Sequence, residues 1–414
     1  MSARAPSGSD VLTVHLVAAE ESGDRLGAAL MRALAQRCGG EIRFAGVGGH
    51  EMASAGLTSL FPIDDLAIFG LLAIPRRLPM ILRRIRQAAG ATAAARPDAL
   101  VIIDSPDFTH RVARRVRAWA PSVPIVDYVS PSVWAWRPGR ARAMRAYVDH
   151  VLAILPFEPQ VHARLGGPPC TYVGHPLGEQ VAELRPSEAD ARRRMADPPL
   201  VLVLPGSRSS EVRRLMAPFA AAVRLVRERY GPLDLVMPTV PALHARVQEA
   251  TAGWPARPRI VVDPGEKRAA FRQARAALAA SGTVTLELAL AGVPTVGAYR
   301  MGALEMALAR AVVRPQAGVE SVLLANLVLG DKVVPEFLQE DCTASALADA
   351  LVPLLGDTPE RRRQVEAFAR LDDVMGLPAA PSAKAADVVL SVIRQARATA
   401  ALPHPAAARS SSQL

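Results

Sequence analysis

The chain has 414 residues, half of them apolar, and is long enough for two globular domains of roughly 150 to 200 residues each. Its formal net charge of +10 is compatible with nucleic acid, nucleotides or anionic membranes as partners and does not distinguish among them. Three widely spaced cysteines argue against a disulfide framework or a zinc site and favour the cytoplasm. We expect neither a signal peptide nor a membrane-spanning helix, because the apolar runs are too short.

Short apolar runs alternate with longer helical patterns, such as 24–37 and 108–119, along the whole chain. This alternation predicts parallel strands joined by helical crossovers. The expected strands are 11–17, 99–104, 124–129 and 150–155 in the first half, and 200–204, 233–236, 259–262, 276–280 and 295–298 in the second. The sequence therefore predicts an α/β protein with two doubly wound parallel-sheet domains. Because such sheets bind ligands at the carboxyl ends of their strands, we expect an active site in a cleft between the halves.

A polar stretch rich in Pro, Glu and Arg interrupts the apolar periodicity at 177–199. It predicts the boundary between the two domains. The expected organisation is an N-terminal domain at 1–177, a linker at 178–199, a C-terminal domain at 200–375, a C-terminal helix at 376–400 able to pack back on the first domain, and a disordered tail at 401–414.

Polar residues follow the first two apolar strands of the N-terminal half. Glu20 and Ser22 lie where the first strand runs into a helix, and either face a ligand or cap that helix. Asp104 closes the strand at 99–104, where a catalytic base is expected, and Asp107 follows at a helix start. For both aspartates, helix capping is the alternative.

The segment 128–137 follows the next strand and holds two of the four tryptophans of this aromatic-poor chain. Trp134, Trp136 and Arg137, with Ser130, suit recognition of a sugar or an acyl chain. Aromatic packing beneath a domain interface is the alternative interpretation.

Two turns of the second half are typical of anion binding. In the segment 205–211, Gly206 permits close backbone approach, Ser207 donates hydrogen bonds and Arg208 offers a fork to phosphate. Ser281, Gly282 and Thr283 precede a helix that carries Glu287, which suits a diphosphate with an attached ribose. For the turn at 205–211, the alternative is a capped surface turn. The chain has no GxxxxGK motif, and its Gly46–Gly49 segment lacks the spacing of a dinucleotide fingerprint.

Apolar residues and arginines are interleaved at 66–86. This composition predicts either a patch on an anionic membrane surface or a buried helix with a solvated basic side. The membrane-facing candidates are Phe69, Leu71, Leu72, Arg76, Arg77, Arg83 and Arg84.

In their order along residues 11–395, these segments resemble the lipid-A-disaccharide synthase family. The matching stretches are 20–24, 46–49, 104–108, 128–137, 155–158, 174–177, 204–208 with Glu211, and 280–283 with Glu287. Among them, the Trp-Ala-Trp-Arg segment at 134–137 is the most specific.

The resemblance implies a GT-B glycosyltransferase that inverts the anomeric carbon and acts in lipid A (lipopolysaccharide) biosynthesis. Its donor would be UDP-2,3-diacylglucosamine and its acceptor 2,3-diacylglucosamine 1-phosphate (lipid X), giving UDP and a β-1,6-linked disaccharide phosphate. It further implies a homodimer, peripheral on the cytoplasmic face of the inner membrane, without a cofactor or metal. By position, Asp104 would be the catalytic residue, and the nucleotide site would contain Arg208, Asn326, Ser281, Gly282, Thr283, Glu287 and Tyr299.

Other functions remain open at this point. Another UDP-sugar glycosyltransferase or a UDP-sugar epimerase would share the fold but consume no lipid acceptor. A nucleic-acid-binding protein would explain the basic charge, but the arginines are dispersed and no nucleic-acid-binding motif occurs, so we expect no nucleic acid partner.

Overall fold

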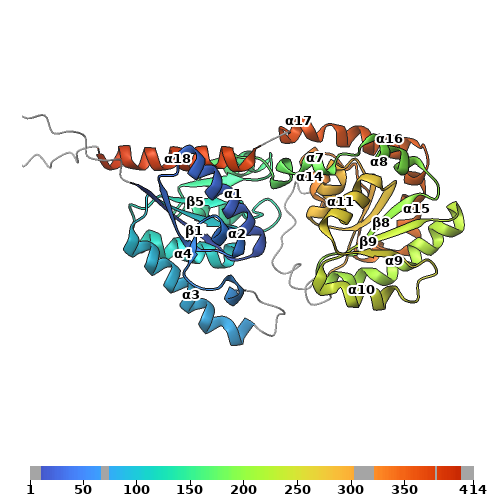
Figure 1. The fold of residues 1–414 in the computed structure, drawn as a ribbon, viewed down its shortest axis with the longest axis horizontal. Helices are drawn as coiled ribbons and strands as arrows, with labels where there is room; N and C mark the ends of the chain where they lie inside the picture. Colours follow the sequence, from blue (N-terminus) through green and yellow to red (C-terminus); the bar gives the residue numbers. More distant parts are fainter. Residues whose placement is uncertain (1–10, 67–73, 303–320, 378–379, 402–414) are drawn as a thin grey trace, which may run out of the picture. The chain divides into compact units, whose positions relative to one another are not determined.

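The computed structural model describes residues 11–66, 74–302, 321–377 and 380–401. The chain divides into two compact units, one made of 1–176 and 380–414 and the other of 177–379 (Figure 1). Each unit is built around its own parallel sheet, which confirms the predicted fold class of two doubly wound α/β domains. No helix in the described ranges is long and apolar enough to cross a membrane.

The first unit contains a seven-stranded parallel sheet with the order β3-β2-β1-β4-β5-β6-β7. Its strands are β1 (Leu12–Ala18), β2 (Ile42–Val47), β3 (Thr58–Ser59), β4 (Ala99–Ile103), β5 (Ile125–Tyr128), β6 (His150–Ala153) and β7 (Cys170–Tyr172). The central strand β4 is buried along its whole length and apolar on both faces, as expected of a parallel strand covered on both sides.

Helices cover both faces of this sheet. One face packs against α1 (Glu21–Arg37), α2 (His50–Ser54) and α18 (Pro381–Ala401). The other packs against α3 (Ile74–Ala95) and α4 (Pro106–Trp119). The shorter helices are α5 (Gly139–Met144), α6 (Glu158–Arg164) and the 3₁₀ turn η1 (Ile63–Leu66).

The C-terminal helix α18 belongs to the first unit, although the whole second unit, 177–379, separates it from the rest of that unit's chain (Figure 1). It runs beside α1, with Ala385 and Val389 fully buried in the same core. Arg37 of α1 pairs with Asp387, and Arg397 Nη2 lies 2.5 Å from Asp98 Oδ1. These ion pairs tie both ends of α18 to the first sheet domain.

The second unit contains a six-stranded parallel sheet with the order β10-β9-β8-β11-β12-β13. Its strands are β8 (Leu200–Leu204), β9 (Asp234–Pro238), β10 (Arg259–Val261), β11 (Ala276–Ala280), β12 (Thr295–Tyr299) and β13 (Glu336–Leu338). Its helices are α7 (Val181–Leu184), α8 (Glu188–Met195), α9 (Ser209–Tyr230), α10 (His244–Thr251), α11 (Pro264–Gln273), α12 (Thr283–Leu290), α14 (Leu324–Leu329), α15 (Ala344–Leu351), α16 (Pro359–Ala369) and α17 (Leu371–Met375).

The segment expected as a linker, 178–199, is an integral part of the second unit and carries α7 and α8. Arg194, near the end of α8, donates to the carbonyl oxygens of Arg272 at 2.8 Å and Gly292 at 3.0 Å. Arg272 lies in the last turn of α11 and Gly292 just beyond the end of α12, and cations at the carboxyl ends of helices stabilise the helix dipole. A polar residue of the segment predicted as a linker, Arg194, therefore binds backbone carbonyl groups of the second unit.

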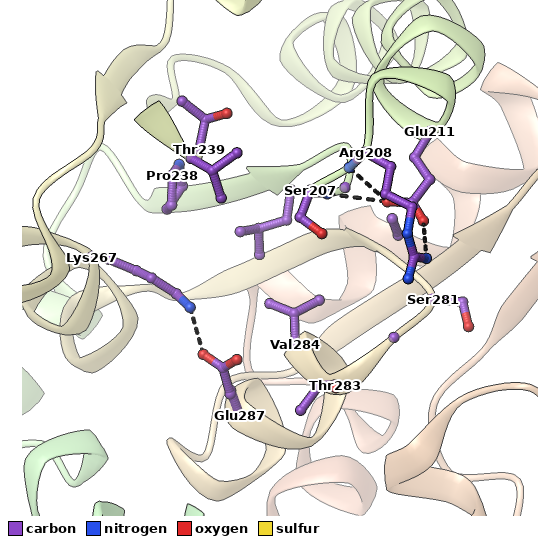
Figure 2. A pocket seen from close by; sticks show the side chains of 15 residues that line it. Ser207, Arg208, Glu211, Pro238, Thr239, Lys267, Ser281, Thr283, Val284 and Glu287 are labelled. Carbon is purple, nitrogen blue, oxygen red and sulfur yellow. Dashed lines mark hydrogen bonds and ion pairs between the residues drawn. The ribbon is translucent and has the colours of Figure 1, made fainter. Parts of the chain in front are cut away.

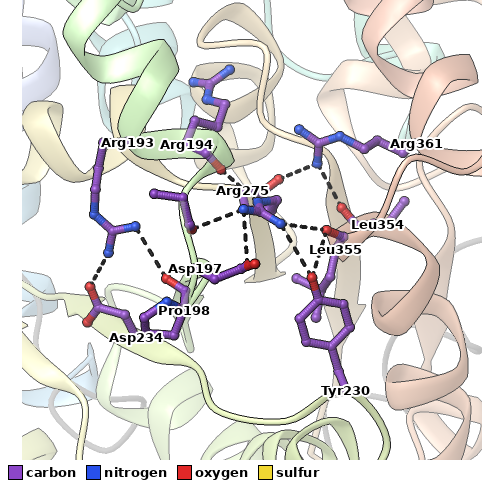
Figure 3. Close-up of polar contacts among 11 residues, drawn as sticks. Arg193, Arg194, Asp197, Pro198, Tyr230, Asp234, Arg275, Leu354, Leu355 and Arg361 are labelled. Carbon is purple, nitrogen blue, oxygen red and sulfur yellow. Dashed lines mark hydrogen bonds and ion pairs between the residues drawn. The ribbon is translucent and has the colours of Figure 1, made fainter.

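Buried arginines close the amino edge of the second sheet (Figure 3). Arg275, 5% exposed, donates to the backbone oxygens of Arg194, Ala196 and Leu355 at 2.7–3.0 Å. Arg361, 9% exposed, donates in turn to the carbonyl oxygen of Arg275 at 2.7 Å. Burial lowers the pKa of Arg361, and the neighbouring Arg275 charge acts in the same direction. Backbone carbonyls, rather than carboxylates, thus supply most of the compensation for these buried charges.

The sequence located nine strands close to their observed positions but missed four. Strands β3, β7 and β13 have only two or three residues, and β2 contains Arg43 and Gly46 within its apolar run. Such short or interrupted segments carry too little periodicity to be distinguished from loops.

We predict that Arg275→Ala lowers the free energy of unfolding by on the order of 3 kcal/mol, because it leaves buried carbonyl groups unpaired. Urea unfolding followed by circular dichroism measures the change. The matched control is Arg192→Ala, because the Arg192 side chain is 74% exposed beside Glu188 and its removal should leave stability unchanged. Equal stability of the two variants would contradict the account.

Candidate functional site

Both sheets have a topological switch point at the carboxyl end of their first strand. In the first sheet, β1 lies between β2 and β4, and in the second, β8 lies between β9 and β11. The crossovers leave such a strand in opposite directions, so the carboxyl ends of the two central strands are left open for ligands. The turns after β1, β4, β5, β8 and β11 are the ones that the sequence predicts to be functional.

Asp104 lies at the first switch point, in a turn with unusual backbone geometry. Asp104 and Ser105 have φ values of 52° and 44°, a left-handed region that non-glycine residues rarely adopt. Hydrogen bonds hold this turn: the Asp104 amide donates to the Tyr128 carbonyl at 3.0 Å, and Thr109 Oγ1 donates to the Asp104 carbonyl at 2.6 Å. Strained turns of this kind persist where the surroundings fix them, often at active sites.

The Asp104 carboxyl group is half-buried, and burial raises its pKa above the usual 3.8. The amide of Ser105, which donates to Oδ1 at 2.7 Å, opposes this shift. Negative charge on Glu20 and Asp127 raises the pKa further, while the Ser22 hydroxyl lowers it by hydrogen bonding. The structure therefore brings Glu20, Ser22 and Asp104 into one electrostatic environment.

A buried polar network lies beside this turn, and the sequence did not reveal it. Asp127 of β5 is 1% exposed, and its Oδ2 lies 3.2 Å from His110 Nε2 of α4. His110 Nδ1 lies 3.0 Å from the hydroxyl of Tyr147. An aspartate inside an otherwise apolar strand was the available signal.

The residues after β1 have separate roles. Glu20 precedes α1 and makes no side-chain cap, and Glu20 and Ser22 are exposed. Asp24 is buried and accepts from the amides of Gly49 at 2.7 Å and Glu51 at 2.9 Å. A Cβ at Gly49 would lie 2.6 Å from Asp24 Oδ2, so glycine is required there. The glycines at 46–49 thus allow the chain to pack against the end of β1.

In the loop at 129–138, one tryptophan packs inward and the other is exposed, so aromatic packing and a surface for ligand recognition occur together. Ser130 is buried and Trp134 packs inward against Phe157, with ring centroids 5.5 Å apart. Trp136 and Arg137 are exposed. Asp107 is exposed at the start of α4 and lies 3.4 Å from Arg140 Nη2.

A cavity of about 300 Å³ opens at the switch point of the second sheet (Figure 2). It lies at the lower end of the usual volumes of small-molecule sites. Its lining includes seven of the residues predicted to bind the donor: Gly206, Ser207, Arg208, Ser281, Gly282, Thr283 and Glu287. The lining residues that the sequence did not single out for the site are Leu204, Glu211, Pro238, Thr239, Val240, Lys267, Ala280 and Val284.

The turn after β8 is organised by Glu211. Gly206 has φ 113°, and a side chain there would collide with the Glu211 carboxylate. Glu211 Oε2 accepts from the amides of Ser207 at 3.1 Å and Arg208 at 3.2 Å, which were expected to face an anion. Arg208 Nη1 lies 3.0 Å from Glu211 Oε1, but the Arg208 side chain is 79% exposed. Its guanidinium is therefore exposed to solvent, although it is paired with Glu211.

Opposite this turn, Lys267 and Glu287 form an ion pair of 2.6 Å (Figure 2). Lys267 is one of only three lysines in a chain with 49 basic residues, a signal that could have drawn attention to it. The helix α12 begins after Gly282 without a side-chain cap, so its first amides face the cavity uncapped. The cavity thus offers an arginine, open helix amides and an oriented carboxylate.

Two residues predicted for the nucleotide site do not line this cavity. Tyr299 ends β12, and Asn326 is buried in α14. The Asn326 side chain accepts from the amides of Val333 at 3.1 Å and Val334 at 2.8 Å, and donates to the Val334 carbonyl at 2.9 Å. Its hydrogen bonds therefore fold the segment 321–334.

The membrane-facing candidates are only partly described. Phe69, Leu71 and Leu72 lie outside the described residues, as does the side chain of Arg76. Arg77 and Arg83 are exposed on α3. Arg84 pairs with Asp65 and lies over the Phe61 ring, 4.7 Å from its centroid. The predicted tail residues 402–414 also lie outside the described part.

Across the described part of the chain, no group of three or more His, Cys, Asp or Glu side chains could hold a metal ion. The two switch points offer a carboxylate in the first unit and, in the second, a cavity lined by an arginine and the start of α12.

The two Rossmann-like parallel sheets, each with a polar switch point, are those of the GT-B fold. Acinetobacter baumannii MurG has this fold, with a TM-score of 0.56 and 16% identity over 92% of this chain and 99% of that one. The UDP-GlcNAc 2-epimerase of Neisseria meningitidis, solved with UDP-GlcNAc, gives a TM-score of 0.57 and 10% identity over 93% and 99%.

The sequence comparisons are more specific. The family model described as lipid-A-disaccharide synthetase matches residues 14–381. A lipid-A-disaccharide synthase of Rhodopseudomonas palustris (strain ATCC BAA-98 / CGA009) is 60% identical over 397 residues, covering 96% of this chain and 100% of the relative. The chain belongs to the lipid-A-disaccharide synthetase family, which confirms the resemblance and the predicted enzyme class of glycosyltransferase.

We predict that Asn326→Ala destabilises the protein by about 1–3 kcal/mol, because buried backbone groups of Val333 and Val334 lose their partners. Thermal unfolding without ligand measures this loss. Val322→Ala is the control, because Val322 lies in the same segment with a side chain 42% exposed. A variant of unchanged stability that binds UDP more weakly would instead support direct contact between Asn326 and the nucleotide.

Proposed function

We propose that the protein is a lipid-A-disaccharide synthase. It transfers 2,3-diacylglucosamine from UDP-2,3-diacylglucosamine to 2,3-diacylglucosamine 1-phosphate, with inversion, and forms a β-1,6-linked disaccharide 1-phosphate and UDP. The family membership over residues 14–381 supports the overall reaction. The observation that carries the chemistry is the half-buried Asp104 carboxylate at the switch point of the first sheet.

Asp104 acts as the general base in this proposal. Inversion in a single displacement needs a base for the incoming 6-hydroxyl and no covalent nucleophile. The carboxylate of Asp104 takes the proton as the oxygen attacks the anomeric carbon and the bond to the UDP oxygen breaks. Burial raises the pKa of Asp104, which makes it a stronger base than an exposed aspartate.

The second unit stabilises the leaving UDP. The exposed Arg208 guanidinium and the uncapped amides at the start of α12 supply positive charge for the diphosphate. Glu287, held by Lys267, suits the ribose hydroxyls. The α12 amides and the paired Glu287 are already positioned, so they need little reorganisation as negative charge develops. No metal ion has a role in this proposal.

The protein further acts, in this proposal, as a homodimer on the cytoplasmic face of the inner membrane. Both substrates carry acyl chains, so the site must lie close to a bilayer surface. On α3, the exposed Leu78 lies among Arg77, Arg83 and Arg86, a combination suited to an anionic lipid surface.

The proposal predicts that purified protein in neutral detergent, with EDTA present, converts both substrates to UDP and disaccharide phosphate. Asp104→Asn should lower kcat by roughly 10²- to 10⁴-fold without changing UDP affinity. In the native enzyme, kcat/KM should fall as the pH drops through the Asp104 pKa, at a value above 3.8, because protonation removes the base.

The matched control for this experiment is Asp373→Asn, an exposed carboxylate in the second unit, which should retain full activity. Full activity of Asp104→Asn would refute the base assignment. UDP-sugar binding without transfer to the lipid acceptor would favour another glycosyltransferase or an epimerase.

A second prediction concerns the membrane. Reversing the exposed charges in Arg83→Glu/Arg86→Glu should weaken binding to anionic vesicles at least tenfold, at about 1 kcal/mol per basic residue. Vesicle co-sedimentation measures this. Arg84 is unsuitable for this test because its pairing with Asp65 would be lost as well.

The control pair is Arg43→Glu/Arg164→Glu, which changes the net charge equally at other exposed positions of the same unit. Equal weakening in both double variants would show that overall charge, rather than the α3 surface, governs vesicle binding.

A further inference from the structure

The loop at 129–138 has a buried half that fixes it to α6. Ser130 Oγ lies 2.8 Å from His162 Nε2, and both residues are buried. Trp134 Nε1 donates to Glu158 Oε1 at 3.3 Å, and Val133 packs in a small core with Ala141 and Val161. The loop is therefore a rigid support for whatever its outer half displays.

The outer half displays two cations against one aromatic ring. Trp136 is 38% exposed, and the guanidinium carbons of Arg137 and Arg140 lie 4.4 and 5.6 Å from its ring centroid. Arg137 has φ 54°, the strained left-handed region, so the anchored loop imposes this arrangement. We call Trp136, Arg137 and Arg140 the arginine platform.

The arginine platform carries uncompensated positive charge. Asp107 is the one carboxylate within ion-pair distance of either arginine in the described ranges. It lies 3.4 Å from Arg140 Nη2, and its own side chain is 79% exposed. The Arg140 side chain is only 17% exposed, so water screens its charge incompletely. The two guanidinium groups together therefore keep a net positive charge and N–H groups that suit an anionic ligand.

The arginine platform is also tied to the proposed catalytic turn. Asp107, its acidic partner, is three residues from Asp104 and lies in the first turn of α4. A ligand group bound by the arginines would therefore lie near the base that receives the acceptor hydroxyl. On a hexose 1-phosphate, the 6-hydroxyl and the phosphate are likewise separated by one sugar ring.

We propose that the arginine platform is the subsite for the phosphate monoester of the acceptor. Arg137 and Arg140 donate N–H bonds to the phosphate oxygens, because guanidinium forks match phosphate geometry. The Trp136 ring packs against the sugar. This inference depends on the proposed function, since it assigns the phosphate of that reaction's acceptor.

The test compares two acceptors, 2,3-diacylglucosamine 1-phosphate and the same sugar without its phosphate, in neutral detergent. Arg137→Ala and Arg140→Ala should each lower kcat/KM for the phosphorylated acceptor roughly 10- to 100-fold, mainly through KM. The loss with the other acceptor should be much smaller, so the preference for phosphate collapses. Arg142→Ala, an exposed arginine of the same helix α5, is the matched control and should keep the preference.

Each other outcome would overturn the assignment. Equal losses on both acceptors would show that the arginines only support the loop. The variant Arg137→Lys keeps the positive charge but lacks the guanidinium fork, and it serves as the control against misfolding. Lost binding to anionic vesicles with an unchanged acceptor preference would identify a bilayer headgroup as the ligand. If the native protein transfers to neither acceptor, the proposed function itself is wrong, and this assignment with it.

Discussion

The architecture depends on one topological constraint, the switch point of a doubly wound parallel sheet. At β1/β4 and at β8/β11, the crossovers diverge and leave the strand ends uncovered. The chain must then supply polar groups at those ends, because the strands themselves are apolar and buried. It supplies a carboxylate in the first unit, and an arginine with open helix amides in the second.

Much of this arrangement is predictable from the sequence because it is local. A buried apolar strand followed at once by Asp104, or by Gly206-Ser207-Arg208, indicates the edge of a parallel sheet without any tertiary information. The loop with Trp134 and Trp136 is also recognisable, although the sequence could not say which ring packs inward. Long-range packing decided that: Trp134 meets Phe157 and Glu158, while Trp136 stays exposed.

Contacts between distant residues were beyond the reach of sequence reasoning. The sequence does not show that the Asn326 side chain binds backbone groups of Val333 and Val334, seven and eight residues further along the chain. Asp24 lies in the first turn of α1, but its carboxylate accepts from the amides of Gly49 and Glu51 at the start of α2. The sequence does not indicate a role for Lys267 in the nucleotide site, because its partner Glu287 is 20 residues away in the chain. In each case a polar side chain satisfies buried backbone or charge elsewhere in the fold.

The central claim is that the nucleotide binds at the switch point of the second unit. Hydrogen–deuterium exchange of the full-length protein with and without UDP tests it most directly. UDP should slow exchange at the start of α12, where its phosphates would accept from the uncapped amides, and in the turn of Gly206 to Arg208, which the bound nucleotide would cover. Unchanged exchange in both segments under saturating UDP, with slowing only around other strands, would contradict it.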